Sequence, residues 1–300
     1  MKRDKHRDEE GGPPCVLLVF VDGLGFGSRD PAINPLYRGD SPCLADWIEH
    51  DAVAVDACLD LPGTPQSATG QASLLTGRNA AMEAGRHVAG FPTESLKILI
   101  REHNLFTQLT RLGYRSTFAN AYYLEDPIAI QRRRQSVTTV ATLAAFGSVR
   151  DLPFLLRDEA VYQDLTRESL RDRGYTGPLT TPGEAAEHLL RIAVQHDFTL
   201  FEYFQTDFAA HSGSDERRQL ILRRLDAFLD SLRNFSRTPG NLFLLTSDHG
   251  NIEDAHGTGH TRNPVPLIAR GRGAAHMKSR VKSLTDFVPA LLELYPKGAP

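Results

Sequence analysis

The hydrophobic pattern of the chain alternates between short, mainly apolar runs and longer segments in which apolar residues recur at helical spacing. The runs occupy residues 15–21, 198–204 and 242–247. Runs of this length and composition are typical of strands buried on both faces of a parallel sheet. Helical patterns separate them, so the sequence predicts an α/β fold in which helices sandwich a mostly parallel sheet.

The composition of the chain changes between about residues 96 and 190. Arg-rich helical segments predominate there, and TTPGEAAEHL marks a Pro/Gly boundary. We predict that 96–190 forms a small inserted cap on a core made of 14–95 and 191–300. YRSTFAN, inside this range, is a further candidate core strand, which leaves the left boundary of the cap open. Near the end of the chain, SLTDFVPALLELYP predicts a short helix capped by Ser283 or Thr285.

The charge balance narrows the classes of partner. The 300 residues carry a formal net charge of -3, so there is no global basic field to attract nucleic acid, and a small soluble substrate fits better. Residues 1–13 mix both charge signs and are closed by Gly-Gly-Pro-Pro, which predicts a disordered tail rather than a signal peptide or a membrane span. Cys15, Cys43 and Cys58 show no CxxC spacing and favour reduced thiols in a cytoplasmic protein.

Potential metal ligands follow all three apolar runs. An Asp-Gly turn or a satisfied polar histidine explains any one of them alone, but the repetition favours a shared site. The carboxyl ends of parallel strands meet at one edge of a sheet, where residues distant in sequence converge. Carboxylate and imidazole groups gathered there predict a metal site. The candidate ligands are Asp22, Asp207, His211, Asp248, His249 and His260.

A hydroxyl group stands at the start of a predicted helix in LPGTPQSATGQASLLTGRNA. The helix is expected to run from about Ala68 to Gly77, with Ser67 at its N-terminus. Free backbone N–H groups and the positive end of the helix dipole favour a phosphate or an alkoxide at that position. An ordinary N-cap is the alternative use of this serine, and Thr64 and Thr69 are rival hydroxyls. No histidine is adjacent to the serine in sequence, so activation by a metal is the expected route.

Four motifs together resemble the metalloenzyme core of the alkaline phosphatase superfamily. They are SDHGN, GHTRNPVPLI, TDFAAHSG and the DGLG that follows a strand. The resemblance is greatest to the branch of cofactor-independent phosphoglycerate mutase and phosphopentomutase, and it covers about 15–90 and 195–295. It implies that Ser67 is the nucleophile that carries the phosphoryl group.

The same resemblance implies two divalent metal ions. One ion is expected at Asp22, Ser67, Asp248 and His249, and the other at Asp207, His211 and His260. Relatives on this branch typically use manganese and more distant ones zinc, so Mn²⁺ is expected ahead of Zn²⁺. His256 receives no role from the resemblance.

Several cationic residues are candidate substrate contacts. Phosphoglycerate mutase has a much larger insertion with an Arg/Lys clamp, and no such clamp is recognisable in the shorter insertion here. Three consecutive helical residues cannot all point one way, so at least two of the cluster at 132–134 are expected on a solvated face. The candidates are Arg132, Arg133 and Arg134, together with Arg78, Arg86 and His87 just beyond the nucleophile helix.

The sequence thus predicts a metal-dependent enzyme that hydrolyses or transfers the phosphoryl group of a small phosphorylated metabolite through a phosphoserine. Hydrolysis is favoured because the mutase clamp is not recognisable. The alternatives are an intramolecular phosphomutase of the phosphoglycerate or phosphopentose type and a metal-binding protein with little catalysis. Sulfatase chemistry is disfavoured because the Cys/Ser-x-Pro-x-Arg signature is absent from the segment around Ser67.

Overall fold

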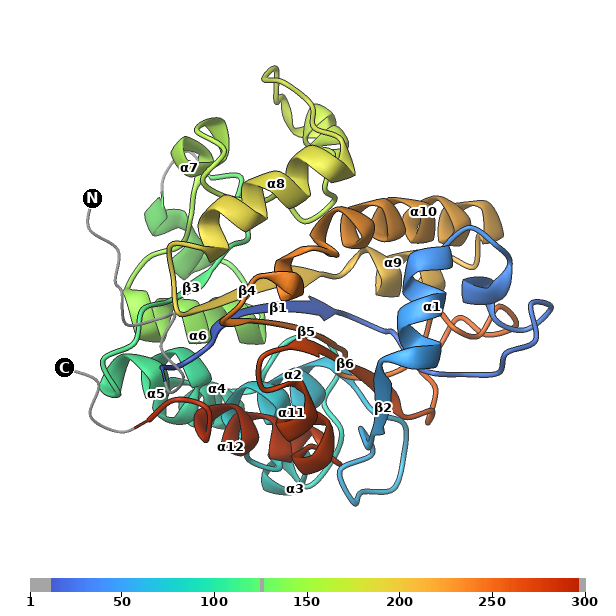
Figure 1. The fold of residues 1–300 in the computed structure, drawn as a ribbon, viewed down its shortest axis with the longest axis horizontal. Helices are drawn as coiled ribbons and strands as arrows, with labels where there is room; N and C mark the ends of the chain where they lie inside the picture. The colour runs from blue at the N-terminus through green and yellow to red at the C-terminus, as the bar shows by residue number, and fades with distance from the viewer. Residues whose placement is uncertain (1–11, 125–126, 297–300) are drawn as a thin grey trace.

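A single mixed sheet organises the chain (Figure 1). The computed structural model describes residues 12–124 and 127–296, and within them six strands pair in the order β2-β6-β5-β1-β4-β3. β1 pairs in parallel with β4 and β5, β4 pairs in parallel with β3, and β6 is antiparallel to both β5 and β2. The strands are β1 (Cys15–Val21), β2 (Ala52–Val55), β3 (Ser116–Phe118), β4 (Phe198–Tyr203), β5 (Asn241–Thr246) and β6 (Val265–Gly271).

The three apolar runs of the sequence are the three central strands, which confirms the predicted mostly parallel sheet. Every residue of β1 is buried, because this strand has neighbours on both sides and helices on both faces. Phe20 stands in register with Glu202 of β4 and with Thr246 of β5. The carboxyl ends of the three strands therefore lie level, and the residues that follow them share one edge of the sheet.

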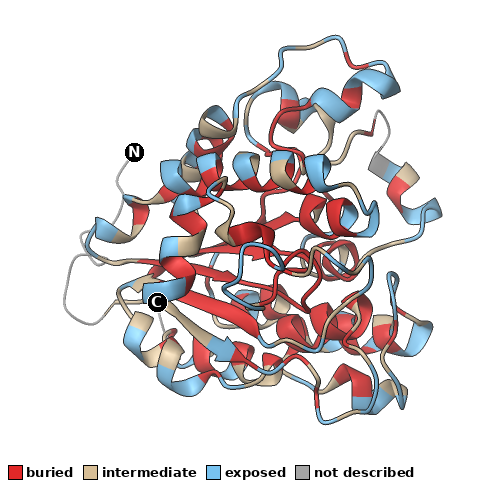
Figure 2. Cartoon of the chain, turned by 90° about the vertical axis from the view of Figure 1, so that its right-hand side faces the viewer, coloured by how far each residue is buried: buried red, intermediate tan, exposed pale blue. Residues whose placement is uncertain are grey.

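Helices cover both faces of the sheet, and alternate residues of β1 enter two separate hydrophobic clusters. Leu17 and Val19 pack with one set of helices, whereas Val16 and Leu18 pack with the other. Figure 2 shows the buried sheet between the partly exposed helices. The first set is α1 (Pro42–His50), α8 (Pro182–Ala193), α9 (Gln205–His211) and α10 (Asp215–Leu232). The second is α2 (Ser67–Thr76), α3 (Ala80–Ala84), α4 (Glu94–His103), α5 (Leu105–Arg111), α6 (Val137–Phe146), α11 (Ala274–Arg280) and α12 (Phe287–Leu292).

Local sequence signals fix several helix ends. α8 begins with a capping box in which Thr181 and Glu184 satisfy each other's backbone N–H groups. α2 ends at Gly77, whose φ of 71° is the left-handed conformation that glycine adopts without strain. Ser283 forms a capping box with Asp286 at the short 3₁₀ turn before α12, as the sequence indicated for this region.

The middle of the chain contributes both to the sheet and to a separate small cluster. β3 is the predicted YRSTFAN strand, and α4, α5 and α6 pack in the same cluster as β1. Beyond it, α7 (Leu152–Leu156) packs with Tyr162 and Tyr175. The limits of an inserted cap at 96–190 remain a prediction. The predicted tail lies, except for Gly12 and Pro13, outside the described residues. None of the helices in the described ranges has both the length and the apolar character needed to cross a membrane.

Candidate metal centre

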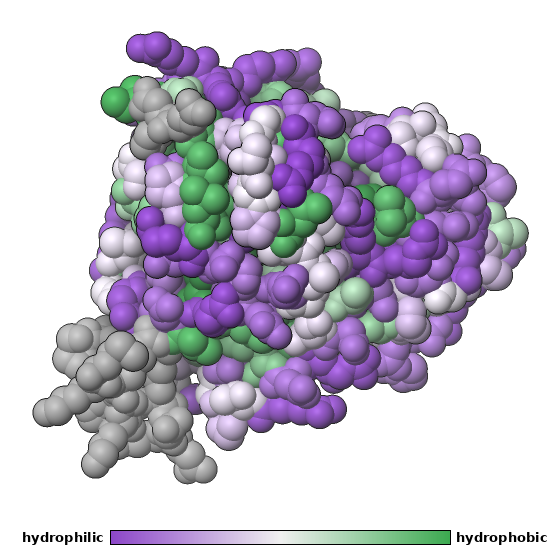
Figure 3. Space-filling model, turned by 90° about the horizontal axis from the view of Figure 1, so that it is seen from above, coloured by the Kyte–Doolittle hydropathy of each residue, from purple (hydrophilic) through white to green (hydrophobic). Residues whose placement is uncertain are grey.

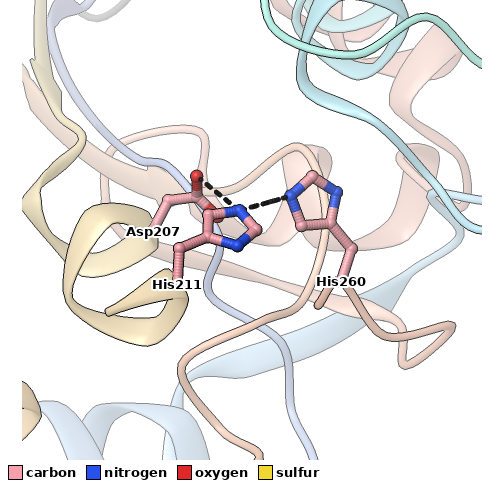
Figure 4. A group of neighbouring side chains, drawn as sticks. All are labelled: Asp207, His211 and His260. Carbon is pink, nitrogen blue, oxygen red and sulfur yellow. Dashed lines mark hydrogen bonds and ion pairs between the residues drawn. The ribbon is translucent and has the colours of Figure 1, made fainter. Parts of the chain in front are cut away.

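Three of the predicted ligands meet just beyond the end of β4 (Figure 4). Asp207 and His211 are four residues apart in α9 and lie one turn apart on one helix face. His260 arrives from the loop between β5 and β6. Its Nε2 atom lies 3.1 Å from Nε2 of His211 and 3.5 Å from Oδ1 of Asp207. We refer to Asp207, His211 and His260 as site B.

The other four predicted residues, Asp22, Ser67, Asp248 and His249, meet beside site B and are called site A. Nε2 of His249 is 3.0 Å from Oγ of Ser67 and 3.2 Å from Oδ1 of Asp22. The same nitrogen lies 3.6 Å from Oδ2 of Asp248. Asp248 and His249 are fully buried. Thus the structure brings all seven residues together at one centre, where His249 and His260 stack with their ring centroids 3.7 Å apart. Their division between two ions stays a prediction from the family resemblance.

Ser67 is the first residue of α2, one position earlier than the sequence indicated. Gln66 occupies the N-cap position, and no side chain caps the helix. The hydroxyl of Ser67 is therefore not used as a cap and faces His249 instead. The rival Thr69 is committed elsewhere, because its Oγ1 donates to the Gln66 carbonyl and accepts from the Val88 N–H. The sequence analysis found no histidine adjacent to Ser67 because the one that contacts it, His249, is 182 residues away along the chain.

Backbone carbonyls orient the three imidazole rings. Nδ1 of His211 is 2.6 Å from the Thr258 carbonyl, and Nδ1 of His260 is 2.9 Å from the Pro65 carbonyl. Nδ1 of His249 faces the carbonyl of Gly250 at 3.3 Å. A carbonyl only accepts hydrogen bonds, so Nδ1 carries a proton and Nε2 is the nitrogen that faces the centre. A metal ion bound at Nε2 would replace the proton that this nitrogen carries in an imidazolium such as that of His249.

The electrostatics of the centre call for added positive charge. Asp22, Asp207 and Asp248 are all buried. Burial and the negative charge of Asp248 hold the pKa of Asp22 well above its ordinary value. Burial lowers the pKa of His249, but Asp248 and Asp22 outweigh it and raise that pKa to about 10. Burial and the positive charge of His249 lower the pKa of His260. In the metal-free protein, protons on Asp22 and His249 therefore balance part of the buried negative charge. Divalent cations would balance it more fully.

The donor atoms present fit divalent metal ions. Asp207, His211 and His260 each place one ligand atom within 4.8 Å of the others, and Asp22, Asp207 and His249 do the same. Mixed carboxylate and imidazole donors suit Mn²⁺ or Zn²⁺. The two triads share Asp207, so one carboxylate lies within reach of candidate ligand atoms from both sites.

Two amide side chains that the sequence analysis missed hold the ligand carboxylates. Nε2 of Gln71 donates to Oδ2 of both Asp22 and Asp248, at 3.2 Å each. Nδ2 of Asn251 donates to Oδ1 of Asp207 at 2.7 Å. The spacing of four residues from Ser67 placed Gln71 on the same face of α2, which was an available signal.

Glu253 is a third missed residue and connects the two loops that carry ligands. Its buried carboxylate accepts from the backbone N–H groups of Gly25 and Asn251, at 2.9 and 2.8 Å. It also accepts from Oγ1 of Thr261 at 2.5 Å and from Nδ2 of Asn263 at 3.0 Å. The loop after β1 is thereby tied to the loop between β5 and β6. No spacing in the sequence signals this role.

Close backbone approach at the centre requires two glycines. A Cβ atom on Gly70 would lie 2.7 Å from the carbonyl oxygen of Asp248. Gly23 has a φ of 72°, and a Cβ there would lie 2.9 Å from Oδ1 of Asp207. Helix α2 and the loop after β1 therefore reach the ligands only because these positions lack side chains.

A pocket of about 440 Å³ opens beside Ser67, Asp22 and Asp207. Of the cationic candidates, Arg133 and Arg134 line it. The remaining four candidates do not line it. Arg132 and Arg86 are exposed, and Arg78 follows the C-terminal end of α2. His87 is half-buried and lies close to Gly63. His256 is exposed on the loop between β5 and β6 and belongs to neither site.

Comparisons with known proteins agree with the motifs. A family model described as the metalloenzyme superfamily matches residues 14–294. The 2,3-bisphosphoglycerate-independent phosphoglycerate mutase of Cereibacter sphaeroides is 31% identical over 125 residues, and that of Syntrophotalea carbinolica is 31% identical over 123 residues. Each match covers 39% of this chain but only 24% of the mutase.

Solved structures of similar fold cover nearly the whole chain. A protein from Pyrococcus horikoshii has a TM-score of 0.60 at 13% identity and matches 96% of this chain and 98% of its own. Alkaline phosphatase from the Antarctic bacterium TAB5 has a TM-score of 0.57 at 11% identity and matches 97% and 100%. At these identities the similarity shows the fold alone. Together with the family match, it confirms the resemblance to the alkaline phosphatase superfamily.

Proposed function

The chain belongs to the metalloenzyme superfamily, and from this membership we propose that it is a two-metal phosphohydrolase or phosphotransferase acting on a small phosphomonoester. The observation that carries the proposal is the position of Ser67. Its hydroxyl stands at the N-terminus of α2, does not cap the helix, and faces His249 of site A. A serine placed in this way at a group of metal ligands is suited to accept a phosphoryl group.

Sites A and B each provide ligands for one ion, with Mn²⁺ expected ahead of Zn²⁺. When bound, the two ions would lower the pKa of the Ser67 hydroxyl and neutralise charge on the phosphoryl oxygens. The chain itself fixes the ligands, since Gln71 holds Asp22 and Asp248 while Asn251 holds Asp207. The positive end of the α2 dipole adds attraction for the anionic group.

Two steps follow from this arrangement. Oγ of Ser67 bonds to phosphorus while the ester P–O bond breaks and the alcohol departs with a proton. Water then breaks the Oγ–P bond and releases inorganic phosphate. Among the described residues, Cys43 and Cys58 are free thiols, which supports action on a cytoplasmic metabolite.

An intramolecular phosphomutase of the phosphoglycerate or phosphopentose type is the second candidate. The similarity to the two phosphoglycerate mutases favours it. The short match to those relatives and the absence of a recognisable clamp favour hydrolysis, because a mutase must retain its dephosphorylated intermediate and exclude water.

The test uses Mn²⁺-loaded protein with p-nitrophenyl phosphate, 3-phosphoglycerate and ribose 5-phosphate, following free phosphate and isomers together. We expect phosphate release, its loss on chelation, its return with Mn²⁺ or Zn²⁺, and phosphoserine at residue 67 in acid-quenched samples by mass spectrometry. Ser67→Ala is expected to lower turnover by orders of magnitude, whereas Thr64→Ala, which removes a neighbouring hydroxyl, is not. Isomer formation without phosphate would favour the mutase, and full turnover in metal-free protein would exclude both candidates.

A further inference from the structure

The pocket beside Ser67 has two walls of different origin. The core provides one wall, which includes the ligand carboxylates, and residues 118–173 provide the other, here called the middle wall. Aromatic rings are common to both: Phe91, Phe204 and Phe208 from the core and Tyr122, Tyr123 and Tyr162 from the middle wall. A cavity of about 440 Å³ with this lining has the size and character of a small-molecule site.

The polar groups of the pocket are largely committed to each other. The hydroxyl of Tyr122 bonds to Thr139 at 2.7 Å. The side-chain amide of Asn120 donates to the Glu202 carbonyl and accepts from the Glu202 N–H. A sugar needs free donors and acceptors for its hydroxyl groups, because buried hydroxyls without partners are costly. Ring faces whose neighbouring hydroxyl and amide groups already have partners favour a flat, apolar ring as the body of the ligand.

Exposed rings lie at the same pocket. Phe208 is 53% exposed and Phe91 39% exposed, although both line the cavity. Phe208 packs edge-on against Phe204 at 5.2 Å between ring centroids. Figure 3, which looks down on one face of the molecule, shows that apolar residues on that face form small groups within a mostly hydrophilic surface. Large apolar side chains kept exposed beside a candidate nucleophile are expected where a ligand covers them.

Arginines complete the pocket. Arg173 donates to the Tyr123 carbonyl at 3.0 Å and lies 4.9 Å above the Tyr123 ring, and Arg134 lies 4.3 Å above the Phe91 ring. Arg133 lines the cavity as well. Among the described residues, none of the three forms an ion pair with a carboxylate. Guanidinium groups that lie over aromatic rings and have no carboxylate partner among the described residues are suited to a second anionic group on an aromatic ligand.

We propose that the substrate is an aromatic phosphomonoester whose ring carries a second acidic group. The ring would lie among the aromatic side chains while its phosphate faces Ser67, and the acidic group would meet the arginines. This inference rests on the proposed function for the identity of the reacting ester, but the pocket can be tested without any turnover.

The experiment measures binding of three phosphonates, which the enzyme cannot cleave as esters, to the Mn²⁺-loaded protein by calorimetry. We expect benzylphosphonate to bind at least about tenfold more tightly than 2-hydroxyethylphosphonate. We expect 4-carboxybenzylphosphonate to bind several-fold more tightly still. Equal affinity for the benzyl and hydroxyethyl ligands, or no binding of any of them, would overturn the aromatic pocket.

Paired variants, one inside and one outside the pocket, test which residues cause the preference for the benzyl group and the gain from the carboxylate. Phe91→Ala is expected to reduce the preference for the benzyl ligand, whereas Ile98→Ala, an exposed apolar residue of α4 outside the pocket, leaves it unchanged. Arg133→Gln is expected to abolish the gain from the carboxylate, and Arg132→Gln, its exposed neighbour, to retain it. If both arginine variants behave alike, the second acidic group is excluded. Phosphate release from esters is measured separately, so the proposed function and this inference fail independently.

Discussion

Replacing Glu253 is expected to damage both stability and metal binding. Glu253 is 1% exposed, and its carboxylate accepts four hydrogen bonds, two of them from the backbone N–H groups of Gly25 and Asn251. In Glu253→Ala these two buried donors lose their acceptor. Each unsatisfied buried donor costs about 1–3 kcal/mol, so the pair predicts a loss of about 4 kcal/mol in the free energy of unfolding.

Glu253→Gln is the informative control, because it keeps the shape and one carbonyl oxygen. That oxygen can still accept from both backbone N–H groups, so we expect a loss of only about 1 kcal/mol. Urea unfolding of the metal-free protein gives the free energies, and titration with Mn²⁺ gives the affinity. Because the same carboxylate ties together the loops that bear Asp22 and His260, Mn²⁺ should bind Glu253→Ala more weakly. An alanine variant within 1 kcal/mol of the wild type, or a glutamine variant as damaged as alanine, would refute this account.

Two further predictions concern other charged groups of the site. Burial raises the pKa of Glu202 from an ordinary 4.5 to about 7. The folded state therefore prefers the protonated carboxyl. The contribution of Glu202 to the free energy of unfolding falls as pH rises from about 4.5 to about 7 and is constant above about pH 7. Glu202→Gln should accordingly raise the thermal midpoint of the metal-free protein at pH 8 but not at pH 4, and a difference that is independent of pH would contradict the assignment. His211→Ala should lose one of the two bound ions in a metal analysis, whereas His256→Ala on the neighbouring loop should keep both; equal losses would remove the distinction between site B and its surroundings.

The strands that stand out most clearly in the sequence are β1, β4 and β5, which each have neighbours on both sides, whereas the edge strand β3 was only a candidate. β1, β4 and β5 are mainly apolar because both faces of the central sheet are buried. β2 is a four-residue edge strand with three partly or fully exposed positions, so its sequence has little to distinguish it from a loop. The antiparallel direction of β6 was also beyond prediction, because direction depends on the path of the chain between strands.

The convergence of the candidate ligands could be predicted because most of them stand at or near the end of a buried strand or helix, where sequence pattern and position coincide. Apart from Gln71, whose spacing from Ser67 was a signal, the residues that hold a candidate ligand have no such pattern. Glu253 reaches Gly25 across 228 positions of sequence, and Asn251 reaches Asp207 across 44. Such pairs exist only after the strands have assembled. The sequence also left the role of Ser67 undecided. If α2 began at residue 68, Ser67 would be its N-cap; because α2 begins at Ser67, the hydroxyl does not cap the helix.

The seven candidate ligands occupy positions 22, 67 and 207–260, whereas the middle wall of the pocket comes from residues 118–173. The middle wall, which in our proposal would contact the alcohol portion of a substrate, therefore contains no candidate ligand of either site. Under that proposal, mutations in this stretch would alter which alcohols are accepted and leave the candidate ligands unchanged. A lineage built in this way can diversify by exchanging one internal segment, and laboratory selection for new substrates is best concentrated on that segment.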